Sequence, residues 1–240
     1  MKVFAVPARE TNLMYVVLGD EGTLLLVDPV DMNKIRDFLK DNKIQHSRVA
    51  SLTTHGHSDH NAGNKELLEA FPNAEIFAGS DRSFANRICS DGDVVCFPDI
   101  YIICMHTPCH TLDSYSYYVS TSRGESKSIF VGDTLFYSGC GKFFEGTAEM
   151  MQACFRKIFS SPPDTLIYFG HDYKKTNLRF RESILGSALE QEDNVFSVIN
   201  SEKQNNIFVN TGLLDNHRDF ASLSPVERLN LLRQMKDRFV

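Results

Sequence analysis

The residues best equipped for chemistry lie in one short segment, Thr54–Gly63 (THGHSDHNAG). Three histidines and one aspartate fall within six positions of it: His55, His57, Asp59 and His60. Imidazole and carboxylate together suit zinc or iron, whereas calcium and magnesium take mostly oxygen. Four such groups rarely serve one ion. Their alternation predicts two neighbouring ions, one bound by His55 and His57 and the other by Asp59 and His60.

Three later segments repeat one arrangement, in which an apolar strand ends at a metal-binding side chain. Residues 102–105 precede His106 and His110, residues 129–131 precede Asp133, and residues 166–169 precede His171. Strand ends along one sheet edge bring separate segments together. We expect His110 to be the ligand and His106 to be structural. The full predicted ligand set is His55, His57, Asp59, His60, His110, Asp133 and His171.

Two further residues near these segments could take part in the chemistry, Asp28 by orienting a ligand and Cys140 as a nucleophile. Asp28 ends a strand before Pro29, where it either orients a ligand imidazole or only forms a turn. Cys140 lies beside Lys142 and suggests a nucleophile. It has no histidine outside the predicted metal set to act as its base, so we do not assign it that role.

The elements that must position these residues alternate between strand and helix. Strand signals cover residues 13–18, 23–27, 49–53, 75–78, 101–105, 115–120, 128–131 and 166–169. Helical signals cover residues 31–42, 65–71 and 148–159, and a hairpin turn is expected at 123–125. This mixture predicts an α/β (α+β) protein whose sheets are covered by helices.

The chain becomes polar, helical and poor in strands from about residue 173. Ser224-Pro225-Val226-Glu227 combines a serine cap, a first-turn proline and a capping-box glutamate, so it predicts a closing helix to about Phe239. Residues 201–210 are polar and are expected to form a loop. We therefore predict a catalytic domain over 1–172 and a small helical substrate-binding domain over 173–240.

Composition narrows the class of protein. A chain of 240 residues with 42% hydrophobic content can bury a large core. The net charge of −6 argues against nucleic acid as partner and against a metal-dependent nuclease. We expect no membrane span and no signal peptide. The six cysteines form no CxxC pair, so we expect free thiols in a cytoplasmic monomer.

The ligand pattern resembles that of the metallo-β-lactamase superfamily, and within it the glyoxalase II (hydroxyacylglutathione hydrolase) family. The order and spacing of the seven predicted ligands match the superfamily's binuclear pattern. Segments 107–111, 132–136, 139–147 and 170–173, together with the closing helix, narrow the match to glyoxalase II. The resemblance covers nearly the whole chain. It implies a four-layered αββα sandwich followed by a helical domain.

The resemblance also implies the metal chemistry. One ion is held by three histidines (His55, His57, His110), the other by Asp59, His60 and His171, and Asp133 bridges the two. Zinc is the first expectation for these two divalent ions, with iron or manganese as alternatives. A metal-bridging hydroxide attacks the thioester carbonyl, with Asp59 and Asp133 as catalytic ligands. The implied reaction converts S-D-lactoylglutathione, or a related thiol conjugate, to D-lactate and free thiol in methylglyoxal detoxification.

The substrate contacts match the family only in part. Lys142 and Tyr173 correspond to family residues that hold the thiol part of the substrate, whereas Phe144 replaces a tyrosine. The family also grips the glycine carboxylate of glutathione with an arginine and a lysine, but the stretch 205–211 is uncharged here. A different thiol carrier without that free carboxylate, such as a glutathione–polyamine conjugate, would explain a neutral pocket. The alternative is a relocated cation: Lys174, Lys175, Arg179 or Arg181.

Two other functions remain to be weighed against hydrolysis. A mononuclear-iron persulfide dioxygenase uses a related scaffold, but segment 142–146 and the long helical tail favour the hydrolase. A non-catalytic binding protein on this scaffold would be expected to lose ligands, and the set here is complete.

Overall fold

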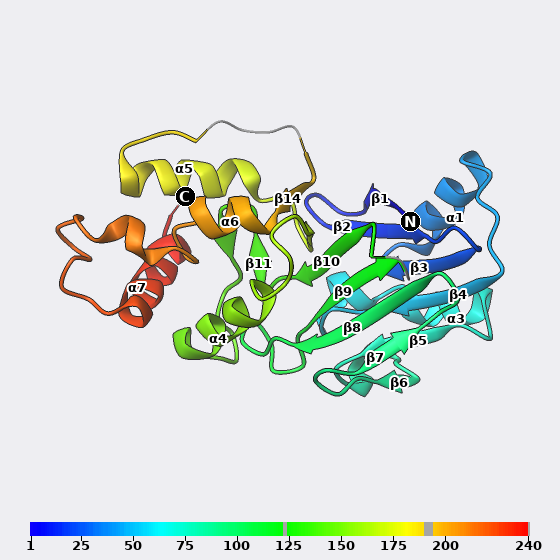
Figure 1. Cartoon of the computed structure of the whole chain (residues 1–240). Coiled ribbons are helices and arrows are strands. Elements are labelled where there is room, and N and C mark those ends of the chain that lie inside the picture. Colours follow the sequence, from blue (N-terminus) through cyan, green and yellow to red (C-terminus); the bar gives the residue numbers. More distant parts are fainter. Residues whose placement is uncertain (122–123, 190–193, 240) are drawn as a thin grey trace.

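Two six-stranded sheets form the centre of the molecule in the computed structural model, which describes residues 1–121, 124–189 and 194–239 (Figure 1). The first sheet has the order β1 (Lys2–Pro7), β2 (Leu13–Leu18), β3 (Thr23–Val27), β4 (Arg48–Leu52), β5 (Glu75–Ala78) and β6 (Arg87–Ile88). The second has the order β14 (Phe196–Val198), β13 (Leu166–Phe169), β10 (Lys127–Gly132), β9 (Tyr115–Thr121), β8 (Ile100–His106) and β7 (Val94–Cys96).

Helices cover the outer face of each sheet, giving four layers. The first sheet is covered by α1 (Met32–Asp41) and α3 (Asn64–Ala70). Helices α4 (Ala148–Ile158) and α6 (Ile199–Asn205) contact the second sheet, and α5 (Lys174–Leu185) and α7 (Pro225–Asp237) share a hydrophobic core with them beyond its end, as Figure 1 shows. Shorter elements are α2 (Ser58–Asn61), the 3₁₀ turns η1 (Asp81–Ser83) and η2 (Thr211–Leu214), and the hairpin of β11 (Leu135–Phe136) and β12 (Gly139–Cys140).

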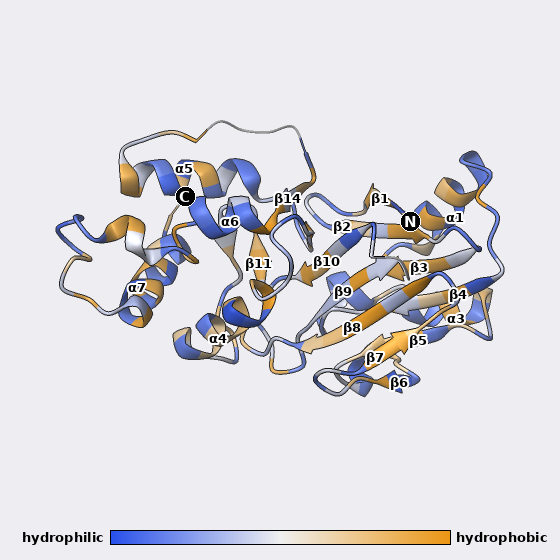
Figure 2. Ribbon diagram, in the orientation of Figure 1, coloured by the Kyte–Doolittle hydropathy of each residue, from blue (hydrophilic) through white to orange (hydrophobic). Residues whose placement is uncertain are grey.

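Alternation along the strands explains the layers. Tyr15 and Val17 of β2 belong to the core between the sheets, whereas Met14 and Val16 pack with the residues of α1 and α3. The strands that contribute to the cores are mostly apolar, as the orange of β5 and β8 shows (Figure 2). The predicted α/β sandwich is therefore confirmed.

Several local predictions need correction. Strands β1, β6, β7 and β14 were not predicted. The loop expected at 201–210 is wrong, because α6 occupies Ile199–Asn205. This polar helix is fixed by its buried Glu202. The Glu202 carboxylate accepts hydrogen bonds from the backbone N–H of Ser138 and from the side-chain amide of Asn206. The turn expected at 123–125 lies partly outside the described residues.

The helical tail is also joined to the second sheet. Strand β14 pairs antiparallel with β13, so a segment beyond residue 173 adds an edge strand to the sandwich. The closing helix begins as predicted, since the Ser224 side chain and Glu227 form a reciprocal capping box at its start. The division into 1–172 and 173–240 stays a prediction.

Candidate metal centre and substrate pocket

The predicted ligands converge at one edge of the sandwich, each at or just beyond a strand end. The loop after β4 carries His55 and His57, and α2 follows with Asp59 and His60. The second sheet supplies the other three from the β8–β9 loop and the ends of β10 and β13: His110, Asp133 and His171. The potential ligand atoms form three groups, and within each group all of them lie within 4.8 Å of one another. These groups are His55–His57–His110, His55–His60–Asp133 and Asp59–His60–His171.

Asp133 lies between the two outer groups, His55–His57–His110 and Asp59–His60–His171. Its Oδ1 is 3.4 Å from His60 Nε2, and its Oδ2 is 3.5 Å from His110 Nε2 and 3.4 Å from His171 Nε2. On the other side of the cluster, Asp59 Oδ2 is 3.4 Å from His171 Nε2. One carboxylate therefore reaches both groups, while the other reaches only one.

Two of the imidazoles are oriented through a single buried carboxylate. His60 Nδ1 donates to Asp28 Oδ2 at 2.9 Å. His55 Nδ1 lies 3.1 Å from Thr54 Oγ1, and that hydroxyl donates to the same Asp28 oxygen at 2.7 Å. The nitrogen of each ring that faces the cluster is thereby left with its lone pair free. Asp28 is thus placed where a residue that orients ligands has to be.

Two other imidazoles are tied from outside in the same way. His110 Nδ1 donates to the Lys142 carbonyl at 3.1 Å, and His171 Nδ1 is 3.0 Å from Thr11 Oγ1. Asn12 Nδ2 donates to Asp59 Oδ2 at 3.2 Å. Sequence reasoning did not find Thr11 or Asn12, because lone polar residues before a strand carry no recognisable signal.

The spacing of the ring nitrogens fits ions held between them. Two ligands about 2.05 Å from a tetrahedral ion lie about 3.3 Å apart. His57 Nδ1 is 3.0 Å from His55 Nε2 and 3.1 Å from His110 Nε2, and His60 Nε2 is 3.2 Å from His171 Nε2. Lone pairs at these distances repel unless a metal ion or a shared proton lies between them.

Asp133 supports the same conclusion, because its buried Oδ1 has no hydrogen-bond partner in the described part of the chain. The cluster therefore suits divalent metal.

Two glycines allow the segments to approach this closely. A Cβ at Gly132, which has φ +50°, would lie 2.4 Å from Thr54 Oγ1. A Cβ at Gly170 would lie 2.3 Å from Asp133 Oδ1. The glycines before Asp133 and His171 are thus packing requirements at the site.

Charges within the cluster shift its pKa values in both directions. Burial alone would raise the pKa of Asp133, but the neighbouring imidazoles, His60 first, hold it well below its ordinary value. Burial would lower the pKa of His171, yet hydrogen bonds to Asp133 and Asp59 raise it to about 9. Burial and His60 lower the pKa of His55, favouring the neutral form that binds metal.

A pocket of about 640 Å³ opens beside the cluster and receives side chains from the helical layer. Lys142, Phe144 and Tyr173 line it, and their contact with the substrate stays a prediction. The Tyr173 ring stacks on His171 with centroids 4.8 Å apart, and the Phe144 ring lies 5.0 Å from that of His110. His106 lies outside the ligand groups and hydrogen-bonds the Leu112 carbonyl at 2.8 Å.

The pocket is not neutral, because it holds cations from outside the stretch 205–211. Arg233 and Lys236 of α7 line it, one turn apart on one face of the helix. The four lysines and arginines proposed as substitutes do not: Lys174, Lys175, Arg179 and Arg181. The family resemblance pointed to the stretch 205–211 for these cations, whereas the fold brings the closing helix to the site.

The sequence has full-length relatives with one shared name. It is 34% identical to the cytoplasmic hydroxyacylglutathione hydrolase of Arabidopsis thaliana over 258 residues, covering 100% of this chain and 99% of that protein. The chain belongs to the hydroxyacylglutathione hydrolase family. A second member of that family, the hydroxyacylglutathione hydrolase of Cronobacter sakazakii, is 33% identical with 100% of both chains covered. No protein-family model matches the chain. Its enzyme class is therefore thioester hydrolase, as predicted.

Solved structures agree on the fold of this hydroxyacylglutathione hydrolase family member. ETHE1 from Myxococcus xanthus superposes with a TM-score of 0.71 at 24% identity, covering 98% of this chain and 90% of that one. The BLEG-1 B3 metallo-β-lactamase gives 0.66 at 19% identity, with 87% and 100% covered. These likenesses establish the metallo-β-lactamase fold. None of the helices in the described ranges combines the length and apolar character needed to cross a membrane.

Proposed function

We propose that the protein hydrolyses S-D-lactoylglutathione, or a closely related glutathione thioester, to D-lactate and free thiol with two divalent ions. The observation that carries this is the position of Asp133, within 3.5 Å of ring nitrogens from both outer groups. A carboxylate so placed suits a bridge between two ions. Identity of 31–34% to relatives named for this activity favours it over a persulfide dioxygenase.

Each ion would take its ligands from both sheets. One would be held by three histidines (His55, His57, His110), and the other by Asp59, His60 and His171, with Asp133 shared. Five imidazoles and two carboxylates suit zinc first, with iron or manganese as alternatives. Two such ions supply an activated water at neutral pH and a Lewis acid for the carbonyl oxygen.

The chain's own residues keep the ligands in their working form. Asp28 fixes the ring of His60 directly and that of His55 through Thr54. These hydrogen bonds hold the protons on the outer nitrogens, which orients the rings and raises their basicity toward the metal. Asp59 is mainly a ligand, and Asn12 sets the direction of its carboxylate.

The pocket supplies the charge that a glutathione conjugate needs. Arg233 is held by the Cys140 carbonyl at 2.7 Å and by Asp237, while Lys236 Nζ donates to the Thr176 carbonyl at 3.3 Å. Lys236 keeps donors for a further partner, and we assign it the glycine carboxylate. This removes the reason to invoke a conjugate without that carboxylate.

The leaving group needs little help. A thiol has an ordinary pKa near 8.5, so its thiolate departs without a strong general acid. Cys140 lines the pocket, but burial raises its pKa to about 11, which keeps it a protonated thiol. A cysteine nucleophile is therefore disfavoured, and Lys142 and Tyr173 are left to hold the thiol portion.

Metal content measured together with thioester hydrolysis tests the proposal. We expect two metal ions per chain and cleavage of lactoylglutathione. One iron per chain, with oxygen consumed on glutathione persulfide, would instead establish the dioxygenase. We further propose a cytoplasmic monomer acting in methylglyoxal detoxification, a compartment supported by the name of the Arabidopsis relative. Light scattering on the purified protein tests the monomer.

A further inference from the structure

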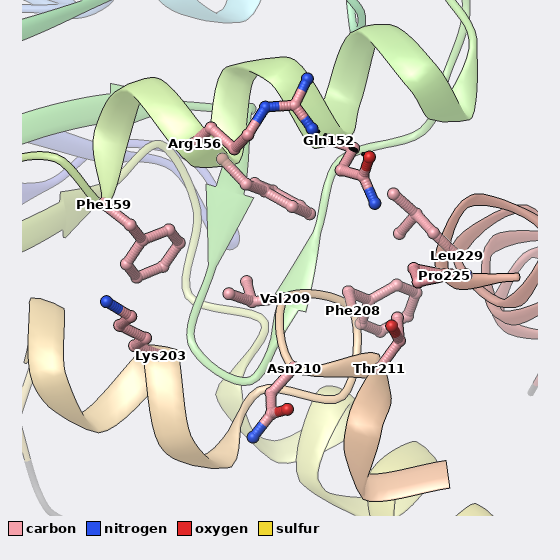
Figure 3. A pocket seen from close by; sticks show the side chains of 11 residues that line it. Gln152, Arg156, Phe159, Lys203, Phe208, Val209, Asn210, Thr211, Pro225 and Leu229 are labelled. Carbon is pink, nitrogen blue, oxygen red and sulfur yellow. Dashed lines mark hydrogen bonds between the residues drawn. The ribbon is translucent and has the colours of Figure 1, made fainter. Parts of the chain in front are cut away.

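A second pocket, of about 430 Å³, lies between α4, α6 and α7 (Figure 3). It shares no lining residue with the substrate pocket. Buried Phe155, Phe208 and Leu229 form its floor, and the exposed Arg156 and Lys203 stand at its mouth. We call it the α4–α7 pocket.

The charge at this mouth is of one sign. Arg156 Nη1 donates to Gln152 Oε1 at 2.9 Å, and Lys203 lies opposite the ring of Phe159 (Figure 3). No acidic side chain is among the lining residues, and within the described ranges neither cation forms an ion pair. In a protein of net charge −6, two uncompensated cations above an apolar floor attract an anion.

We propose that the α4–α7 pocket binds an organic anion with a flat apolar body. The body lies against Phe155, Phe208 and Leu229, and the anionic group meets Arg156 and Lys203. The volume falls within the usual range of small-molecule pockets, and an apolar floor with a few polar groups at the mouth is their usual lining. The inference does not depend on thioester hydrolysis.

The pocket is also connected to the substrate pocket through one side chain. Phe208 lines the α4–α7 pocket, and the Arg233 guanidinium lies 5.6 Å from the centre of its ring. Arg233 in turn lines the substrate pocket. An occupant that fixes Phe208 therefore acts on a cation that faces the substrate, so we expect it to change KM rather than kcat.

Titration of the metal-loaded enzyme with 8-anilinonaphthalene-1-sulfonate tests the site. We expect Arg156→Gln/Lys203→Gln to weaken this anion's binding about tenfold and to leave binding of neutral N-phenyl-1-naphthylamine unchanged. The matched control is Arg36→Gln/Lys40→Gln on α1, which makes the same charge change on exposed residues and should bind as wild type. Probe bound in the substrate pocket is common to all three proteins and cancels.

A pocket-filling variant supplies a test that leaves charge alone. Val209 points into the centre of the pocket (Figure 3), so Val209→Phe should remove one probe site from the stoichiometry. Unchanged affinity in Arg156→Gln/Lys203→Gln, or unchanged stoichiometry in Val209→Phe, overturns the proposal. At a probe concentration equal to its wild-type dissociation constant, KM for the thioester should change more in wild type than in the charge variant, because competition in the substrate pocket is the same in both. An equal effect in both would refute the link through Phe208.

Discussion

Lys236 gives the sharpest test of how the substrate pocket recognises its ligand. Its ammonium group lies 5.4 Å from the ring centre of Phe239 and 5.6 Å from that of Phe180. Burial, and after it the charges of Arg233 and Arg179, lower its pKa to about 8. The replacement Lys236→Met keeps the apolar stem on these rings and removes the charge together with the hydrogen bond to the Thr176 carbonyl.

The magnitude follows from the exposure of the group. A hydrogen bond between charged partners contributes about 1.5–3 kcal/mol, and because Lys236 is only half-buried we take the lower end. Its loss corresponds to about a tenfold fall in kcat/KM at pH 7, which we expect mostly in KM. Free Lys236 loses its proton as pH rises through about 8, so wild-type kcat/KM should also fall above pH 8. Lys236→Met should lack that step.

Steady-state kinetics from pH 6.5 to 9.5 on lactoylglutathione and on its glycine-amide analogue give the readout. Replacing the acid by the amide should lower kcat/KM about tenfold for wild type and only slightly for Lys236→Met. Lys175→Met, an exposed charge on α5 that does not line the pocket, should behave as wild type on both. If Lys236→Met discriminates between acid and amide as strongly as wild type, Lys236 does not bind that carboxylate.

The remaining predictions concern the metal centre and the buried glutamate. Asp133→Ala should abolish hydrolysis and release at least one ion in metal analysis; full activity would exclude a bridging role. Asp28→Asn should weaken metal binding about 10- to 100-fold in chelator competition, because it weakens the orientation of His60; an unchanged affinity would refute this. Burial raises the pKa of Glu202 to about 7, so the folded state binds the proton more tightly than the unfolded chain, and stability should fall between pH 4.5 and 7. Glu202→Gln should match wild type in urea unfolding near pH 4.5 and exceed it by up to about 3 kcal/mol at pH 8; equal stability at both pH values would contradict the reasoning.

The ligand segments were predictable because local sequence specifies them. A dense histidine loop after a strand, and glycine before Asp133 and before His171, are short-range signals that need no knowledge of the tertiary fold. The capping box at Ser224 is another. The sandwich followed from the alternation of strand and helix signals, and the structure confirms it.

What the sequence could not reveal depends on contacts between distant segments. In the sequence, Arg233 and Lys236 look like ordinary charges on a helix. Only the tertiary packing of α7 brings their side chains to the wall of the substrate pocket. Helix α6 was missed because its apolar content is small and its buried contact is the carboxylate of Glu202. Thr11 orients His171 across a sequence separation of 160 residues, which no local pattern records.

Because the ligands come from both sheets, metal binding should affect the stability of the protein and its degradation in the cell. His55 and His60 follow the first sheet, whereas His110, Asp133 and His171 follow the second, so an ion bound by ligands from both would fasten the two halves of the sandwich together. By mass action, an ion present at a hundred times its dissociation constant adds about 2.7 kcal/mol to the free energy of unfolding. Metal starvation would therefore shorten the protein's lifetime as well as stop its turnover, because the loosened sandwich opens more often to proteases.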